Sequence, residues 1–249
     1  MVSSLELGPL TIQTFGLFVA LAFLAAGALV YRRFGELGWD PELAYEATGA
    51  GLVGGIVGAR LWWALGDPGL IFSDPLGHLI GGSGLTWYGG AIGGTLAVWA
   101  WARWRDADLW TLAGAAVPAL ALGYALGRIG CQISGDGDYG IPTDVAWGMA
   151  FPNGVVPTDE IVHPTPIYET LWIGLLALAL WQLRDRLRPQ YLVAIYLVGS
   201  GLERLVVEFW RRNPSVEGFL TVAQITAVLV IAAGAALYAF SRNRPPAPA

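Results

Sequence analysis

The sequence predicts an all-α integral membrane protein of about seven transmembrane helices, with a polar site that faces the outside. Three observations lead to this prediction: the composition, the spacing of long apolar stretches and the distribution of arginine. Hydrophobic residues make up 55% of the 249 residues and charged residues only 13%, whereas soluble domains carry roughly 25% charged residues. Since so few charges cannot cover a water-exposed surface, the apolar surplus is expected to face lipid.

The apolar residues gather in stretches that are long enough to cross a bilayer, at about 20 residues each. Helices are expected there, because lipid offers no hydrogen-bond partner to an unpaired backbone group. The seven stretches are Thr11–Tyr31, Leu43–Leu65, Leu85–Trp104, Leu109–Leu126, Ile167–Leu183, Tyr191–Phe209 and Phe219–Phe240. We therefore expect a single membrane domain over residues 1–249, with outer segments at about 66–83 and 127–164 and a disordered tail at about 243–249.

Arginine sets the expected orientation, because the chain has no lysine and positive residues mark the cytoplasmic side of a membrane protein. In a seven-helix arrangement, nine of the 14 basic residues fall on the same side. These nine are Arg32, Arg33, Arg103, Arg105, Arg184, Arg186, Arg188, Arg242 and Arg244. The N-terminus is therefore expected outside and the C-terminus inside.

The other five arginines lie at or near the outer ends of the predicted helices and need a separate explanation. They are Arg60, Arg128, Arg204, Arg211 and Arg212. A guanidinium binds a phosphate through two parallel hydrogen bonds, so arginines that converge at headgroup level suggest a phospholipid site. Arg211 and Arg212 are interpreted as interfacial anchors, because they follow the end of a predicted helix.

Several other polar residues accompany these arginines in the predicted helices. Glu208 follows Arg204 by four residues and so shares its helix face. Tyr168 and Glu169 open another helix, directly after His163 in HPTPIYE. Arg204 has two readings, as a site residue or as a structural ion pair with Glu208 or Glu169, and His163 has a capping role as its alternative.

The glycines of GAGLVGG and YGGAIGG are expected mainly to allow close helix packing. Gly89 and Gly90 differ, because they follow Tyr88 at the outer mouth of a helix and could leave bare backbone for a headgroup. The net charge of -5 disfavours nucleic acid as a partner. The single cysteine, Cys131, and only two histidines predict no metal centre.

The segments GARLWW, TWYGGAIGG, GRIGCQISGDGDYG, HPTPIYE, LERLVVEFWRR and TVAQ together resemble the prolipoprotein diacylglyceryl transferase family, in their order and spacing along most of the chain. The resemblance implies transfer of the diacylglyceryl group of phosphatidylglycerol to the lipobox cysteine of a prolipoprotein, with release of glycerol phosphate. It also implies that the reaction needs no cofactor and takes place at the outer leaflet of the bacterial cytoplasmic (inner) membrane.

By position, Arg128 and Arg204 resemble the two essential arginines of the family. Tyr88 and His163 complete the catalytic candidates, and the substrate-binding candidates are Arg60, Gly89, Gly90, Asp136, Tyr168, Glu169 and Glu208. The chain departs from the family pattern at four positions, with Tyr88 for histidine, Cys131 for asparagine, Asp136 for glutamate and Ser200 for tyrosine. These departures leave the general base undetermined.

Two alternatives stay open at this point. A divergent relative would bind phospholipid but modify another acceptor or be catalytically inactive, and the four departures favour it. A seven-helix transporter or receptor would need polar residues near the middle of the membrane, whereas the polar residues here gather at one face.

Overall fold

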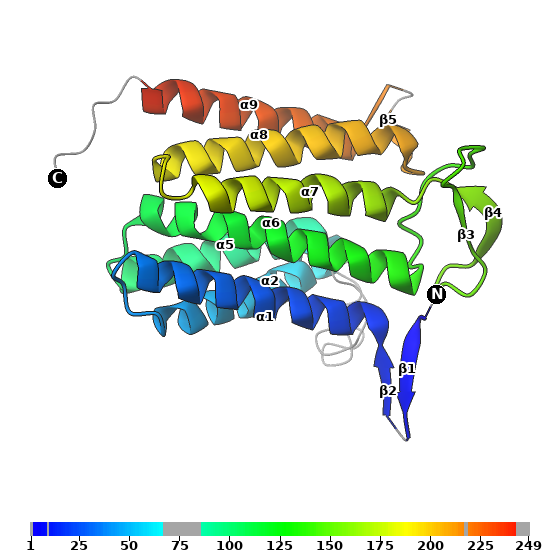
Figure 1. Cartoon of the computed structure of the whole chain (residues 1–249), viewed down its shortest axis with the longest axis horizontal. Helices are drawn as coiled ribbons and strands as arrows, with labels where there is room; N and C mark the ends of the chain where they lie inside the picture. Colours follow the sequence, from blue (N-terminus) through cyan, green and yellow to red (C-terminus); the bar gives the residue numbers. More distant parts are fainter. Residues whose placement is uncertain (1, 9, 67–85, 217–218, 243–249) are drawn as a thin grey trace. The chain divides into compact units, whose positions relative to one another are not determined.

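The computed structural model describes residues 2–8, 10–66, 86–216 and 219–242. The predicted segment at 66–83, apart from its first residue, and the predicted tail at 243–249 lie outside the described residues. Long helices dominate the described part (Figure 1). They are α1 (Thr14–Glu36), α2 (Leu43–Gly66), α5 (Trp87–Trp104), α6 (Leu109–Ser134), α7 (Thr165–Leu183), α8 (Pro189–Val207) and α9 (Val222–Arg242).

Short elements connect the long helices. A 3-10 helix, η1 (Glu208–Trp210), continues α8. The strands form three antiparallel hairpins: β1 (Ser4–Leu7) with β2 (Leu10–Gln13), β3 (Met149–Phe151) with β4 (Thr158–Val162), and β5 (Ser215–Val216) with β6 (Leu220–Thr221). The β3–β4 hairpin belongs to the segment between α6 and α7, where no strand was expected.

The prediction of a helical membrane protein is confirmed. Four of the described helices, α1, α6, α7 and α9, are long and apolar enough to cross a membrane. Three more helices, α2, α5 and α8, coincide with predicted spans, and their membrane crossing stays a prediction. Glycine lowers the hydropathy of α2 and α5, while Glu203 and Arg204 add charge to α8.

The predicted helical stretch Leu109–Leu126 is longer in the structure, because α6 continues to Ser134, and the outer segment at about 127–164 stays a prediction. Arg128 and Cys131 therefore lie on a helix and not in a loop. The helix ends before Gly135, which has a φ of +61°. Glycine is the usual residue at such a left-handed helix end, because it has no Cβ to clash.

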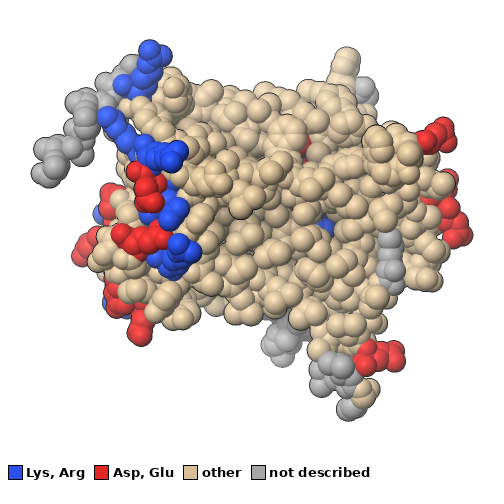
Figure 2. All heavy atoms as spheres, viewed as in Figure 1, with Lys and Arg blue, Asp and Glu red and all other residues tan. Residues whose placement is uncertain are grey.

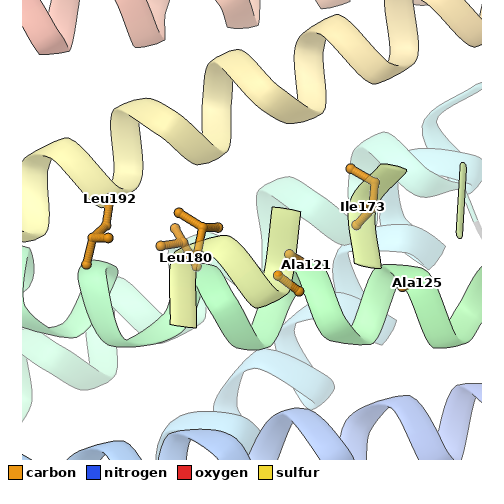
Figure 3. Packing of buried hydrophobic residues seen from close by; sticks show 7 residues of the cluster. Ala121, Ala125, Ile173, Leu180 and Leu192 are labelled. Atoms are coloured by element: carbon orange, nitrogen blue, oxygen red, sulfur yellow. The ribbon is translucent and has the colours of Figure 1, made fainter. Parts of the chain in front are cut away.

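By their contacts the residues form two compact units, Met1–Leu29 with Ala113–Ala249, and Val30–Leu112. In the first unit, α6, α7 and α8 share a buried apolar cluster (Figure 3). Small residues of α6 let the larger side chains of α7 and α8 approach closely. The labelled members are Ala121 and Ala125 of α6, Ile173 and Leu180 of α7, and Leu192 of α8.

The short connection between α7 and α8 makes these helices antiparallel, and α9 packs against α8. The basic residues Arg184, Arg186 and Arg188 lie at this connection, and Arg242 lies at the end of α9. Figure 2 shows blue basic atoms and red acidic atoms together near the end of α9, beside a largely uncharged surface. The start of α7 and the end of α8 therefore meet at the opposite end.

The second unit is built on close packing of α2 against α5. A Cβ added to Gly58 would lie 2.3 Å from the carbonyl oxygen of Gly89, and one added to Gly54 would lie 2.7 Å from the carbonyl oxygen of Gly93. No larger residue fits at these positions without moving the backbone. Glu46 of α2 also forms an ion pair with Arg105 and accepts a hydrogen bond of 3.0 Å from Trp101.

Candidate functional site

A buried cluster of arginines and carboxylates occupies the end of the first unit where α7 begins and α8 ends. Four parts of the fold contribute to it: α6, the loop after α6, the second turn of α7, and the end of α8 with η1. Its members are Arg128, Asp138, Glu169, Arg204, Glu208 and Arg211.

Glu169 lies at the centre of this cluster, and its side chain is 0% exposed. Its Oε2 lies 2.9 Å from Nε of Arg128. Its Oε1 accepts hydrogen bonds of 3.1 Å from Arg211 and 3.4 Å from Arg204. One carboxylate thus holds three guanidiniums that come from different parts of the chain.

Asp138 links two of the same arginines from the other side. Both Arg128 and Arg211 form ion pairs with its carboxylate. Burial raises the pKa of Asp138, but the guanidiniums of Arg128 and Arg211 outweigh this effect and hold the pKa below its ordinary value. Gly137, with a φ of +94°, provides the turn that brings Asp138 back over α6, a conformation that glycine adopts without strain.

Glu208 fixes the position of Arg204. Its Oε2 lies 2.9 Å from Nη2 of Arg204. Its Oε1 accepts hydrogen bonds of 2.6 Å from the Thr221 hydroxyl and 2.8 Å from the Asn213 amide. This carboxylate therefore holds Arg204 in the described structure, and a contact of Glu208 with a substrate stays a prediction.

The cluster balances its charges, with three guanidiniums facing three carboxylates. Such pairing is needed, because a buried charge without a partner costs several kcal/mol, on the order of 3–5 when one partner is removed. Arg204 is the most exposed of the three arginines, at 25%, against 14% for Arg128 and 9% for Arg211. A phosphate offers the same two-oxygen geometry as a carboxylate. It can therefore replace one of these carboxylates as the partner of a guanidinium.

Aromatic residues line a cavity of about 490 Å³ next to the cluster. Its lining comes from the loop before β3, from His163, from the first two turns of α7 and from the end of α8 with η1. The lining residues are Val145, Trp147, His163, Tyr168, Trp172, Val206, Val207 and Trp210. Tyr168 directly precedes Glu169, and Trp210 directly precedes Arg211, so neighbouring residues serve the cavity and the cluster.

His163 and Tyr168, both candidates from the sequence, lie together in this cavity. The Tyr168 hydroxyl lies 3.1 Å from Nδ1 of His163 and accepts a hydrogen bond of 2.8 Å from the Trp147 indole. Trp210 packs against both rings, with centroid distances of 6.0 and 5.9 Å.

Asp136 stands apart from the arginine pairs. Its Oδ1 accepts a hydrogen bond of 3.2 Å from the backbone of Asp138, and burial raises its pKa. The ligand atoms of Asp136, Asp138 and Cys131 lie within 4.8 Å of one another. The two guanidiniums on Asp138 oppose a cation at this position. Cys131 is a buried thiol at 7% exposure, next to the guanidinium of Arg128.

The remaining candidates belong to the second unit. Arg60 is buried at 8% exposure, and the Tyr88 side chain is 36% exposed and stacks edge-on with Trp87. Gly89 is buried against α2, where an added Cβ would lie 2.3 Å from the carbonyl oxygen of Gly58. Gly89 thus takes part in close packing of α5 against α2, and its role at a lipid headgroup stays a prediction.

Comparisons with known proteins bear directly on these features. The family model described as "Prolipoprotein diacylglyceryl transferase" matches residues 3–240. The chain belongs to the prolipoprotein diacylglyceryl transferase family. This membership covers nearly the whole chain, including both structural units and every element of the arginine cluster.

Individual relatives carry the name phosphatidylglycerol–prolipoprotein diacylglyceryl transferase. The chain is 33% identical to one from Synechococcus elongatus, over 96% of this chain and 88% of the relative. It is 31% identical to one from Clostridium tetani, over 96% and 97%, and 34% identical to one from Aromatoleum aromaticum, over 96% and 95%.

Two members of the cluster were not among the candidates from the sequence. Arg211 was interpreted as an interfacial anchor, yet its side chain is 9% exposed and pairs with Asp138 and Glu169. The turn of η1, which directs Arg211 inward, cannot be read from a sequence pattern. Asp138 could have been noticed, because it lies in the polar segment GDGD ten residues after Arg128. Arg212 lies outside the cluster and contacts Glu160 at 3.1 Å.

Proposed function

We propose that this protein transfers the diacylglyceryl group of phosphatidylglycerol to the cysteine thiol of a prolipoprotein and releases glycerol phosphate. Membership of the family supports the reaction. The observation that carries the proposal for the site is the convergence of Arg128, Arg204 and Arg211 on the buried Glu169. Three guanidiniums at one place are suited to a phosphate that becomes more negative as it leaves.

The reaction forms a bond between the cysteine sulfur and a glycerol carbon, and breaks the bond from that carbon to a phosphate oxygen. Negative charge develops on the phosphate, and preorganised cationic donors lower the barrier most where charge develops. Arg204, the most exposed of the three, meets the lipid first. Arg128 and Arg211 follow as the phosphate replaces the carboxylates of Asp138 and Glu169 on their guanidiniums.

The proton of the thiol needs an acceptor, or the thiol needs a lowered pKa. A phenol hydroxyl carries a proton that it can donate in a hydrogen bond. We therefore assign Tyr88 the role of hydrogen-bond donor and orienter and not that of a base. The proton then goes to the leaving phosphate or to another group of the enzyme.

We also propose that all seven long helices cross the bacterial inner membrane, with the N-terminus outside and the C-terminus inside. Arg32, Arg103, Arg186 and Arg242 then share the cytoplasmic side, as the positive-inside rule requires. The arginine cluster, at the opposite end of α7 and α8, lies at the outer leaflet. The acceptor is a secreted prolipoprotein that arrives at the same face, and no cofactor takes part.

The test is complementation of a bacterium depleted of its own transferase, followed by transfer from labelled phosphatidylglycerol to a lipobox peptide. Arg128→Ala and Arg204→Ala are expected to abolish transfer, whereas Arg242→Ala, at the far end of α9, should leave it unchanged. Arg128→Lys should also lose most of the activity, because an ammonium cannot reproduce the bidentate fork of a guanidinium. Full activity of Arg128→Lys would remove the argument for a phosphate clamp.

A further inference from the structure

The aromatic cavity beside the arginine cluster has no role in holding the phosphate. It is lined by apolar and aromatic side chains, with His163 and Tyr168 as its polar members. Pockets of this kind, mostly apolar with a few placed polar groups, are typical of ligand sites. Tyr168 and Trp210, which line the cavity, immediately precede Glu169 and Arg211 of the cluster, so the cavity and the cluster are built on the same turns of the chain.

We propose that this cavity binds the apolar segment of the prolipoprotein next to its cysteine. The inference rests on the proposed function and names the place of the second substrate. Signal peptides carry an apolar region before a small-residue cleavage site, so the acceptor offers apolar side chains close to its thiol. A segment held here presents the thiol to the glycerol carbon of a lipid whose phosphate the arginines hold.

The dimensions of the cavity favour a peptide over an acyl chain. Along α7 the lining extends from Tyr168 to Trp172, which is about 6 Å at 1.5 Å per residue. An acyl chain spans half of the hydrocarbon core, or about 15 Å, and would run further along the helices. In addition, Val145 and Trp147 come from the loop between α6 and α7, at the end of the helices and not along their length.

The polar groups of the cavity are linked to one another and leave one imidazole nitrogen for the peptide backbone. The indole of Trp147 can only donate, so the Tyr168 oxygen accepts from it at 2.8 Å. The Tyr168 hydroxyl and Nδ1 of His163 lie 3.1 Å apart and share a hydrogen bond whose direction is set by the tautomer of the imidazole. This hydrogen bond occupies Nδ1 and leaves Nε2 of His163 for the ligand. Trp147 is a positioning residue that acts through Tyr168.

The experiment fills the cavity in the full-length protein and measures KM separately for phosphatidylglycerol and for the acceptor peptide. Val145→Trp places a large side chain in the lining loop, and Val206→Trp does so from α8, so that one variant serves if the other does not fold. Val155→Trp is the matched control, because Val155 lies in the same outer segment, is 55% exposed and does not line the cavity. Phosphatidylglycerol and synthetic acceptor peptides, with alanine or leucine before the cysteine, are the probes.

Both filled variants are expected to raise KM for the leucine peptide by about tenfold or more, which is the usual discrimination of an apolar pocket, and to leave KM for phosphatidylglycerol unchanged. Trp147→Phe should raise KM for both peptides, because His163 loses its fixed orientation. A rise in KM for phosphatidylglycerol alone would mean that the cavity holds an acyl chain and would overturn the proposal. Unchanged KM values for the leucine peptide in both filled variants would overturn the proposal as well.

A binding measurement separates this proposal from the proposed function. A peptide with a photoreactive benzophenone side chain next to the cysteine is irradiated with the wild-type protein in phosphatidylglycerol-free nanodiscs. Cross-links to Trp147 or Trp172 support the cavity as the peptide site, even if no transfer to the peptide is ever observed. Transfer without cross-links at these residues would leave the proposed function standing and refute the cavity as the peptide site.

Discussion

The central position of Glu169 predicts that loss of its charge destabilises the protein strongly. In Glu169→Gln the side chain keeps its size and one oxygen acceptor, but three guanidiniums lose their shared carboxylate. Removing one partner from a buried ion pair costs about 3–5 kcal/mol. Since the Glu169 side chain is 0% exposed, water cannot solvate the guanidiniums in place of the carboxylate. We therefore expect the free energy of unfolding to fall by an amount in this range.

The matched control is Glu160→Gln. Glu160 also pairs with an arginine, Arg212 at 3.1 Å, but the two side chains are 63% and 38% exposed. Exposed pairs contribute about 0–1 kcal/mol, so this variant should remain close to the wild type. Glu169→Asp keeps the negative charge, and its stability should lie between the stabilities of the two glutamine variants.

The assay is reversible unfolding in mixed detergent micelles, followed by circular dichroism, with and without glycerol phosphate. An anion can replace the missing carboxylate on the arginines, so glycerol phosphate should stabilise Glu169→Gln more than it stabilises the wild type. Equal loss of stability in Glu169→Gln and Glu160→Gln would refute the reasoning. Equal stabilisation of the wild type and Glu169→Gln by glycerol phosphate would show that phosphate does not take the place of the Glu169 carboxylate on the arginines.

Four further predictions concern other parts of the site. Arg211→Ala should abolish transfer as Arg128→Ala does, measured with labelled phosphatidylglycerol, because Arg211 shares both carboxylates of Arg128. Asp136→Asn should be more stable than the wild type at neutral pH, because the raised pKa of Asp136 means that the folded state disfavours the charged carboxylate. In unfolding experiments this gain in stability should disappear as the pH falls below the pKa of Asp136, where the carboxyl is protonated. Tyr88→Phe should slow transfer without shifting its pH profile, and Tyr88→His should keep substantial activity, whereas a pH dependence erased by Tyr88→Phe would identify Tyr88 as a base. Glu203→Met should raise the unfolding temperature. Glu203 is 1% exposed, and its Oε1 accepts no hydrogen bond from the described residues. An apolar side chain of similar shape removes a desolvation cost of about 1–3 kcal/mol.

The sequence was sufficient for the helical architecture, because long apolar stretches have few stable structures other than helices in lipid. The start of α7 at HPTP, where Pro164 is the N-cap residue, and the pairing of Arg204 with Glu208 also followed from local rules, since both depend on residues no more than four positions apart. The end of α6 did not follow. GRIGCQIS resembles a polar loop in composition, and its continuation of the helix depends on close packing of Gly130 against Phe18, where a Cβ added to the glycine would lie 2.7 Å from Cβ of Phe18.

What the sequence by itself determined is the membrane class, the family resemblance and the polar character of one end of the helices. All of these depend on composition and on short-range spacing. The tertiary structure alone decided that Arg211 enters the cluster and that Asp138 closes it, because Arg211 lies 73 residues from Asp138 and 42 from Glu169. Contacts at such separations arise only when α6, α7 and α8 pack together, and no local pattern encodes which charged side chains that packing encloses.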